Sequence, residues 1–86
     1  MKIWKYEFEI ASDMGFYRMP EGSEIVHVEL QNGKPTMWLL VDPEKPDGMR
    51  RTFSVFGTGH EIPPGHVYRG TFQQGSFVWH LFEKVM

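Results

Sequence analysis

Two runs of apolar residues in this chain are separated by Asn32-Gly33, and this dipeptide constrains the fold more than any other feature of the sequence. Asn and Gly both tolerate positive φ angles, which a two-residue type I′ turn requires at its central positions, so the dipeptide predicts a β-hairpin. Before the turn, apolar and polar residues alternate, as expected of a strand with one buried face. The residues expected to face inward are Val26, Val28 and Leu30, and those expected to face outward are His27, Glu29 and Gln31.

The returning strand, residues 34–41, is apolar on both faces. Trp38 and Leu40 fall on one face, and Met37, Leu39 and Val41 fall on the other. Such a strand is typical of the middle of a sheet, or of a sheet whose second face meets another sheet or another subunit. We therefore expect a central strand here. The last strand, residues 76–85, is also apolar on both faces, and so short a chain cannot fully cover such a terminal strand. We therefore also expect a homodimer or higher oligomer, the alternative being that the long loops cover the second face.

Alternation with a period of two recurs along the chain, and no stretch combines a capping residue with the apolar spacing of a helix. Residues 2–10 alternate most regularly, and further strands are expected in 51–57, 66–73 and 76–85. Short strands separated by Gly and Pro predict an all-β fold, a small antiparallel sandwich or barrel of about six strands with little or no helix. At 86 residues the chain is expected to form a single domain, residues 1–86.

The composition argues against several classes of function. The chain has no cysteine, which excludes disulfides, thiolate metal sites and cysteine nucleophiles and is typical of a reducing compartment. No uninterrupted apolar run approaches the roughly 18 residues of a membrane span, so we expect a cytoplasmic protein that does not bind membranes. A formal net charge of −2 argues against general nucleic-acid binding, which depends on Lys and Arg contacts to phosphates.

Reactive side chains do not form a recognisable catalytic or metal motif. None of the spacings among the four histidines matches a metal-binding pattern. Ser54 lacks the flanking glycines and the following helix of a nucleophile elbow. Carboxylates in the alternating strands are explained by solvent-facing positions. The sequence therefore predicts a protein that is not an enzyme and that uses no cofactor or metal.

The loop that follows residues 51–57 is the best candidate for a site. It begins with Gly57, Thr58, Gly59 and His60. Two glycines allow positive φ and close backbone approach, so exposed amides could cradle an anion, and Arg50 and Arg51 would add charge toward a phosphate. Alternatively, the glycines only form a turn or bulge at the end of a strand. Glycine turns are commoner than binding sites, so the sequence favours the turn, and both interpretations stay open.

Aromatic residues make up 15% of the chain. Large rings fill small cores efficiently, and they also stack against planar ligands. The three rings that we add to the candidate ligand-binding residues are Trp38, Tyr68 and Trp79.

Four stretches of the sequence resemble a family of short, uncharacterised proteins found in phages and bacterial genomes. They are IWKYEFEI, MPEGSEIVHVELQNGKPTMWLLVDP, FSVFGTGHEIP and YRGTFQQGSFVWHLFE, and together they cover nearly the whole chain. The motifs that carry the likeness are Met-Pro-x-Gly, Gln-Asn-Gly, Gly-Thr-Gly-His and Val-Trp-His. The family is described only as a domain of unknown function. The resemblance therefore implies a phage accessory protein in the host cytoplasm, and it implies no mechanism.

Two hypotheses follow from this context. In the first, a small non-enzymatic phage-type protein counters host defence by sequestering a nucleotide-like ligand, with rings stacked on the base and glycine amides and arginines on the phosphates. In the second, the protein inhibits a host protein that it captures through an exposed aromatic face or edge of a sheet. The first would release its ligand intact on denaturation, whereas the second would co-purify with a partner and gain no stability from small molecules.

Overall fold

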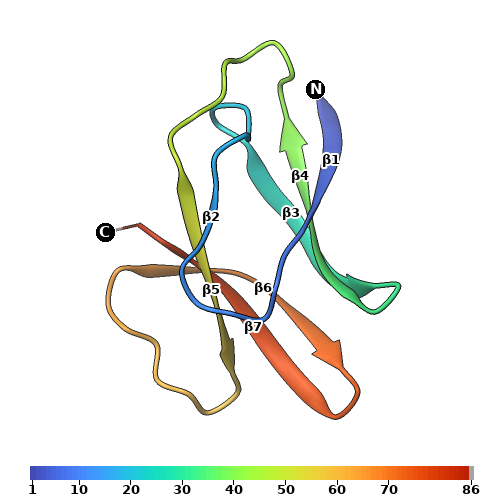
Figure 1. The fold of residues 1–86 in the computed structure, drawn as a ribbon, viewed down its shortest axis with the longest axis vertical. Helices are drawn as coiled ribbons and strands as arrows, with labels where there is room; N and C mark the ends of the chain where they lie inside the picture. The colour runs from blue at the N-terminus through green and yellow to red at the C-terminus, as the bar shows by residue number, and fades with distance from the viewer. Residues whose placement is uncertain (86) are drawn as a thin grey trace.

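The computed structural model describes residues 1–85, which contain seven β-strands. These are β1 (Lys2–Glu7), β2 (Met14–Phe16), β3 (Glu24–Gln31), β4 (Lys34–Val41), β5 (Arg51–Gly57), β6 (His66–Gln74) and β7 (Phe77–Lys84). They form two antiparallel sheets, with the order β1-β4-β3 in the first and β2-β5-β7-β6 in the second (Figure 1). The prediction of an all-β sandwich is confirmed, and the strand beyond the expected six is the short β2. Within the described residues, no helix is long and apolar enough to cross a membrane.

The hairpin predicted at Asn32-Gly33 joins β3 to β4. Asn32 has a φ of 50° and Gly33 a φ of 78°, as a type I′ turn requires. β4 lies between β1 and β3, and its inward side chains Met37, Leu39 and Val41 are fully buried. The central position predicted for this strand is therefore confirmed.

The inward direction predicted for Val26 is wrong. The register between β3 and β4 shifts between Ile25 and His27, so a β-bulge displaces Val26 and leaves 53% of its surface exposed. Ile25 packs against the core instead. Beyond the bulge the alternation resumes, and Val28 is buried as expected.

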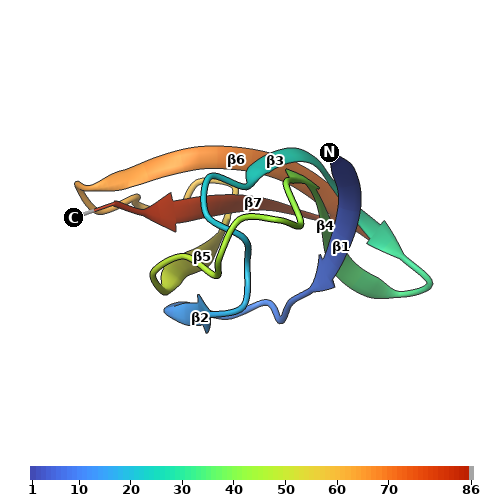
Figure 2. The ribbon, with the colours of Figure 1, turned by 90° about the horizontal axis from the view of Figure 1, so that it is seen from above.

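The two sheets approach each other where β3 lies beside β6 (Figure 2). Gly70 of β6 makes this approach possible, because a Cβ atom at this position would overlap the side chain of Val28. The core between the sheets is apolar, and its fully buried side chains include Phe53 of β5 and Leu81 of β7.

The connection between β1 and β2 joins the two sheets away from the β3–β6 contact. Phe8 N–H donates to Pro35 O at 3.0 Å on the first sheet, and Val55 N–H of the second sheet donates to Ala11 O at 2.9 Å. These backbone hydrogen bonds fix the connection against both sheets.

Candidate functional site

The Gly-Thr-Gly-His sequence forms a tight turn at the end of β5. His60 N–H donates to Gly57 O at 3.1 Å and Gly59 has a φ of 90°, as expected of a type II turn with glycine at its third position. Gly57 N–H donates to His60 Nδ1 at 3.2 Å. The imidazole packs so closely on Gly57 that a Cβ atom there would lie 3.0 Å from His60 Cε1. The geometry of the turn therefore explains why Gly57, Gly59 and His60 occur in the motif. It does not explain why the second position is Thr58.

Thr58 begins a chain of hydrogen bonds on the side of the second sheet that faces away from the core. We call this side the outer face, and it carries Thr52, Phe56, His66, Tyr68, Thr71, His80, Phe82 and Lys84. Thr58 Oγ1 lies 2.8 Å from His80 Nε2, and His80 Nδ1 lies 3.0 Å from Thr71 Oγ1. Thr71 Oγ1 lies 2.6 Å from the hydroxyl of Tyr68. Because both imidazole nitrogens have partners, the ring of His80 is held in one orientation.

Four rings pack against one another on the same outer face. Phe82 contacts Phe56 and Tyr68 edge to face, with centroid distances of 5.7 Å and 5.6 Å. Phe56 contacts His66 in the same way at 5.6 Å. Tyr68 is the most exposed of the four, at 54%. A ring that is supported by its neighbours and open to solvent is a surface on which a planar group can stack.

Positive charge gathers at the other end of the outer face. Lys84 lies opposite Thr52 in the pairing of β7 with β5, and Thr52 lies opposite Gly15 of β2. Gly15 leaves room for Arg50, because a Cβ atom at this glycine would overlap the guanidinium. Arg50, Thr52 and Lys84 line a cavity of about 490 Å³, together with the carboxylate residue Asp13.

Arg51 points the other way, to the inner face, where its charge is neutralised. Its Nε and Nη2 atoms donate to the two carboxylate oxygens of Glu83, each at 2.8 Å, and its Nη1 donates to Ser23 O at 2.6 Å. Arg69 Nε donates to the same carboxylate at 3.0 Å. Burial raises the pKa of Glu83, but the hydrogen bonds and charges of Arg51 and Arg69 outweigh burial and hold the pKa below its usual value.

Two of the predicted rings lie outside the outer face. Trp38 is on the first sheet, where its ring centroid lies 5.5 Å from that of His27. Trp79 faces the inner side of β7, opposite Gly57, and stacks on Phe77 with a centroid distance of 5.8 Å and an interplanar angle of 23°. A pocket of about 300 Å³ is lined by Trp79, Phe77 and the Gly57 turn.

The sequence-predicted residues therefore fall into three groups. The structure brings Arg50, Thr58 and Tyr68 to the outer face. Gly57, Gly59 and His60 form the turn that presents Thr58, and Trp79 lies against this turn. Arg51 and Trp38 lie elsewhere, in the inner ion cluster and on the first sheet.

Sequence analysis missed three residues that complete the outer face. They are His80, Phe82 and Lys84, all on β7. Their alternation along residues 77–84 was a usable signal, since it places them on one side of a strand. This signal does not by itself identify a site, because an apolar second face is also typical of a strand buried on both sides.

Comparisons with known proteins give a family and no function. Within residues 1–85, no group of three or more metal-ligating side chains is arranged to hold an ion. No curated protein and no solved structure matches the sequence. The model of a family described as a domain of unknown function, DUF7352, matches residues 1–86, and the chain belongs to that family.

Proposed function

We propose that this protein is a non-enzymatic binding protein that holds a small nucleotide-like ligand on the outer face of the second sheet. One observation carries the proposal: this face combines an exposed, supported aromatic ring with two cationic side chains. A nucleotide has the two complementary features, a flat base and a charged phosphate.

Tyr68 stacks on the base in this proposal. Its ring is more than half exposed and is supported by Phe82. Stacking of a base on an aromatic side chain contributes about 1–3 kcal/mol. The hydroxyls of Tyr68 and Thr71 adjoin the ring, and each oxygen has one donor and two acceptor sites, so unused capacity remains for the polar edge of a base.

Arg50 and Lys84 bind the phosphate in this proposal. Neither forms an ion pair with a carboxylate among residues 1–85. The cavity that both residues line contains one acidic residue, Asp13, so positive side chains outnumber negative ones there. Thr52 also lines the cavity and adds a hydroxyl donor. Arginine suits this role because its guanidinium can donate to two phosphate oxygens at once.

The resemblance to phage accessory proteins supports binding without conversion. A phage protein that removes a nucleotide signal of its host needs affinity and slow release, and it needs no chemical step. In this setting the protein acts in the host cytoplasm and counters a defence response.

Calorimetric titration with adenosine, AMP and ADP tests the proposal. We expect affinity to rise from the nucleoside to the diphosphate, because added phosphate charge meets the two cations. Lys84→Gln should weaken ADP binding about two- to fivefold and leave adenosine binding unchanged. Tyr68→Ala should weaken binding of both. The matched control is Lys45→Gln, which removes an exposed lysine from the β4–β5 loop.

Three results would contradict the proposal. Equal affinity for the three compounds would exclude a phosphate contact, and no heat from any of them at millimolar concentration would exclude the site. The bound nucleotide should also be recovered with unchanged mass after denaturation. A changed mass would show turnover and would contradict the non-enzymatic part.

A second candidate function is capture of a host protein, and two exposed rings favour it. Tyr68 and Phe77 are 54% and 62% exposed. Aromatic side chains of this kind are typical anchors of protein interfaces. Under this alternative, a host protein co-purifies with the wild type and is lost from Phe77→Ala, while nucleotides leave the melting temperature unchanged.

The expected homo-oligomer belongs to another surface and stays a proposal. On the first sheet, Ile3 lies opposite Leu40, and Trp38 lies on the same side two residues along β4. Ile3 is 54% exposed, so a second copy covering this stripe would bury apolar area. Light scattering measures the mass directly, and a monomer at working concentration would contradict the proposal.

A further inference from the structure

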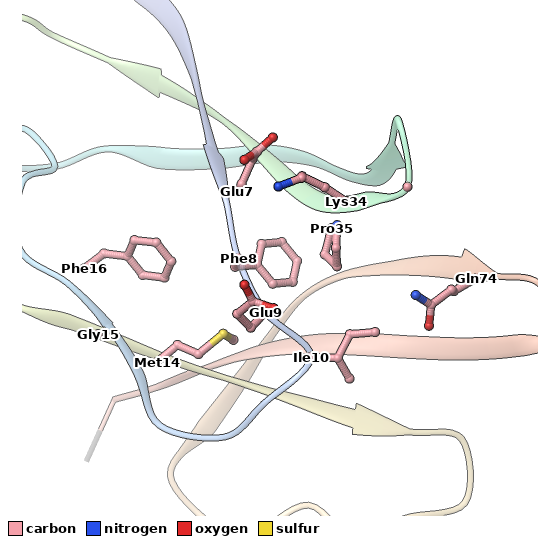
Figure 3. A pocket seen from close by; sticks show the side chains of 11 residues that line it. Glu7, Phe8, Glu9, Ile10, Met14, Gly15, Phe16, Lys34, Pro35 and Gln74 are labelled. Atoms are coloured by element: carbon pink, nitrogen blue, oxygen red, sulfur yellow. The ribbon is translucent and has the colours of Figure 1, made fainter.

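We infer that a groove between the two sheets is a second binding site, selective for a small organic cation with an apolar body. The groove lies between the β1–β2 connection, β2, the β3–β4 turn and the end of β6 (Figure 3). It shares no side chain with the outer face and is therefore independent of the proposed nucleotide site.

The size of the groove suits a small molecule. Its volume is about 760 Å³. Sites for small ligands typically enclose about 300–1,000 Å³ and combine an apolar lining with a few polar groups. The groove lies within this range of volume, and its lining is divided between apolar and polar side chains.

Apolar side chains form the floor of the groove, and the chain holds them in place. They are Phe8, Ile10, Met14, Phe16 and Pro35. Phe8 contacts Phe72 edge to face at 5.6 Å. Phe16 contacts Phe53 in the same way at 5.8 Å. Because these rings are fixed by the core, the floor exists before any ligand binds.

Two carboxylates stand at the rim of this floor. Glu7 and Glu9 are both exposed, and neither forms an ion pair with any residue among 1–85. Figure 3 shows the Glu9 carboxylate beside Phe8, whereas the Glu7 carboxylate lies beside Lys34 at the edge of the groove. Lys34 is the one cation in the lining, so two acidic residues face one basic residue.

This charge decides which end group a ligand can carry. An apolar body gains from burial on the floor whatever its end group is. A carboxylate end group would be repelled by Glu7 and Glu9, whereas an ammonium or guanidinium would be attracted. The cation would also gain from the ring face of Phe16, which is only partly buried, where it lies over that ring. Two solvated carboxylates alone would not define a site, but beside a preformed apolar hollow they select an amphipathic cation.

Three probes with the same apolar body test the selectivity. They are 4-phenylbutylamine, 4-phenylbutan-1-ol and 4-phenylbutanoate, which differ in the charge of one end. Titrations followed by amide NMR of the full chain should show shifts at Glu9, Gly15 and Gly33, with the amine binding most tightly and the carboxylate least. Added salt should weaken amine binding and leave alcohol binding unchanged.

Removing an acidic or a basic side chain at the rim should change the affinity for the amine in opposite directions. Glu7→Gln and Glu9→Gln should each weaken amine binding about two- to fivefold and leave alcohol binding unchanged. Lys34→Gln should strengthen amine binding. All three residues are exposed, so the melting temperature should stay at the wild-type value.

Several outcomes would overturn the inference. Equal affinities of the three probes would show that charge plays no part. Shifts confined to residues outside the groove, or no shift with any probe at millimolar concentration, would show that the groove is not a site. Amine binding that is insensitive to both glutamate variants would remove the proposed recognition.

Discussion

The two faces of the second sheet place the same residue types in different surroundings. On the inner face, Arg51 and Arg69 share the carboxylate of Glu83, which is buried. On the outer face, Arg50 and Lys84 have no carboxylate paired with them among residues 1–85. Arg50 and Arg51 are neighbours in the sequence, but Arg50 precedes β5 and lies beside Gly15 on the outer face, whereas Arg51 begins β5 and faces the inner side.

This difference indicates which charges hold the fold and which are available to a ligand. A buried charge is costly unless it is paired, and on the inner face the carboxylate of Glu83 is paired with both arginines. An exposed cation is stable without a partner, since water solvates it. We therefore expect changes on the inner face to lower stability, and changes on the outer face to lower affinity.

The largest expected loss of stability follows from a substitution on the inner face. Glu83→Gln leaves two guanidinium groups without a counter-charge and should lower the free energy of unfolding by about 3 kcal/mol. The matched control is the adjacent outer-face variant Lys84→Gln, for which we expect a change within about 0.5 kcal/mol. Urea unfolding measures both values. Equal losses of unfolding free energy in the two variants would contradict the different roles assigned to the two faces.

A smaller loss is expected where the sheets meet. Gly70→Ala adds a methyl group that overlaps Val28, and it should cost about 2 kcal/mol of unfolding free energy. Val28→Ala in the same chain should recover part of this loss, because it removes Val28 Cγ2, the nearest of the overlapping atoms. Gln73→Ala, at an exposed position of the same strand, serves as the control. Full stability of Gly70→Ala would show that this contact does not limit the approach of the sheets.

The smallest expected effect is a pH dependence that arises from the inner face. Because its ion pairs lower the pKa of Glu83, they stabilise the fold in full above the unfolded pKa of about 4.5, and this contribution is lost as the pH falls through the folded pKa. The wild type should therefore lose stability faster than Glu83→Gln on acidification below about pH 4.5. Parallel pH profiles of the two proteins would contradict the role given to the cluster.

Much of the fold could be predicted from the sequence because its signals are local. Asn32-Gly33 specifies its turn through the φ angles of two adjacent residues, and the alternation around it gives the strands. The bulge at Val26 has no such local signal. It lies in the strand that packs against β6, a contact between segments about 40 residues apart that no local pattern reports.

The candidate site was harder to predict because its residues come together through pairing across the sheet. Arg51 finds Glu83 at a separation of 32 residues, which no local pattern reports. The place of Thr58 between two glycines is visible in the sequence, but its contact with His80 depends on the pairing of β5 with β7. The alternation of β7 does define two faces. Which of them is buried depends on where the first sheet packs.

Amide NMR of the full chain titrated with ADP tests the central claim most directly, because it shows where on the molecule a nucleotide lies. We expect the largest shifts on the outer face, at Thr52, Tyr68 and Lys84. The amide of Arg51 should shift less than that of Thr52, and the amide of Trp38 on the first sheet should shift little. Shifts centred on Trp38 or on the groove, or no saturable shift at millimolar ADP, would contradict the assignment of the outer face as the binding site.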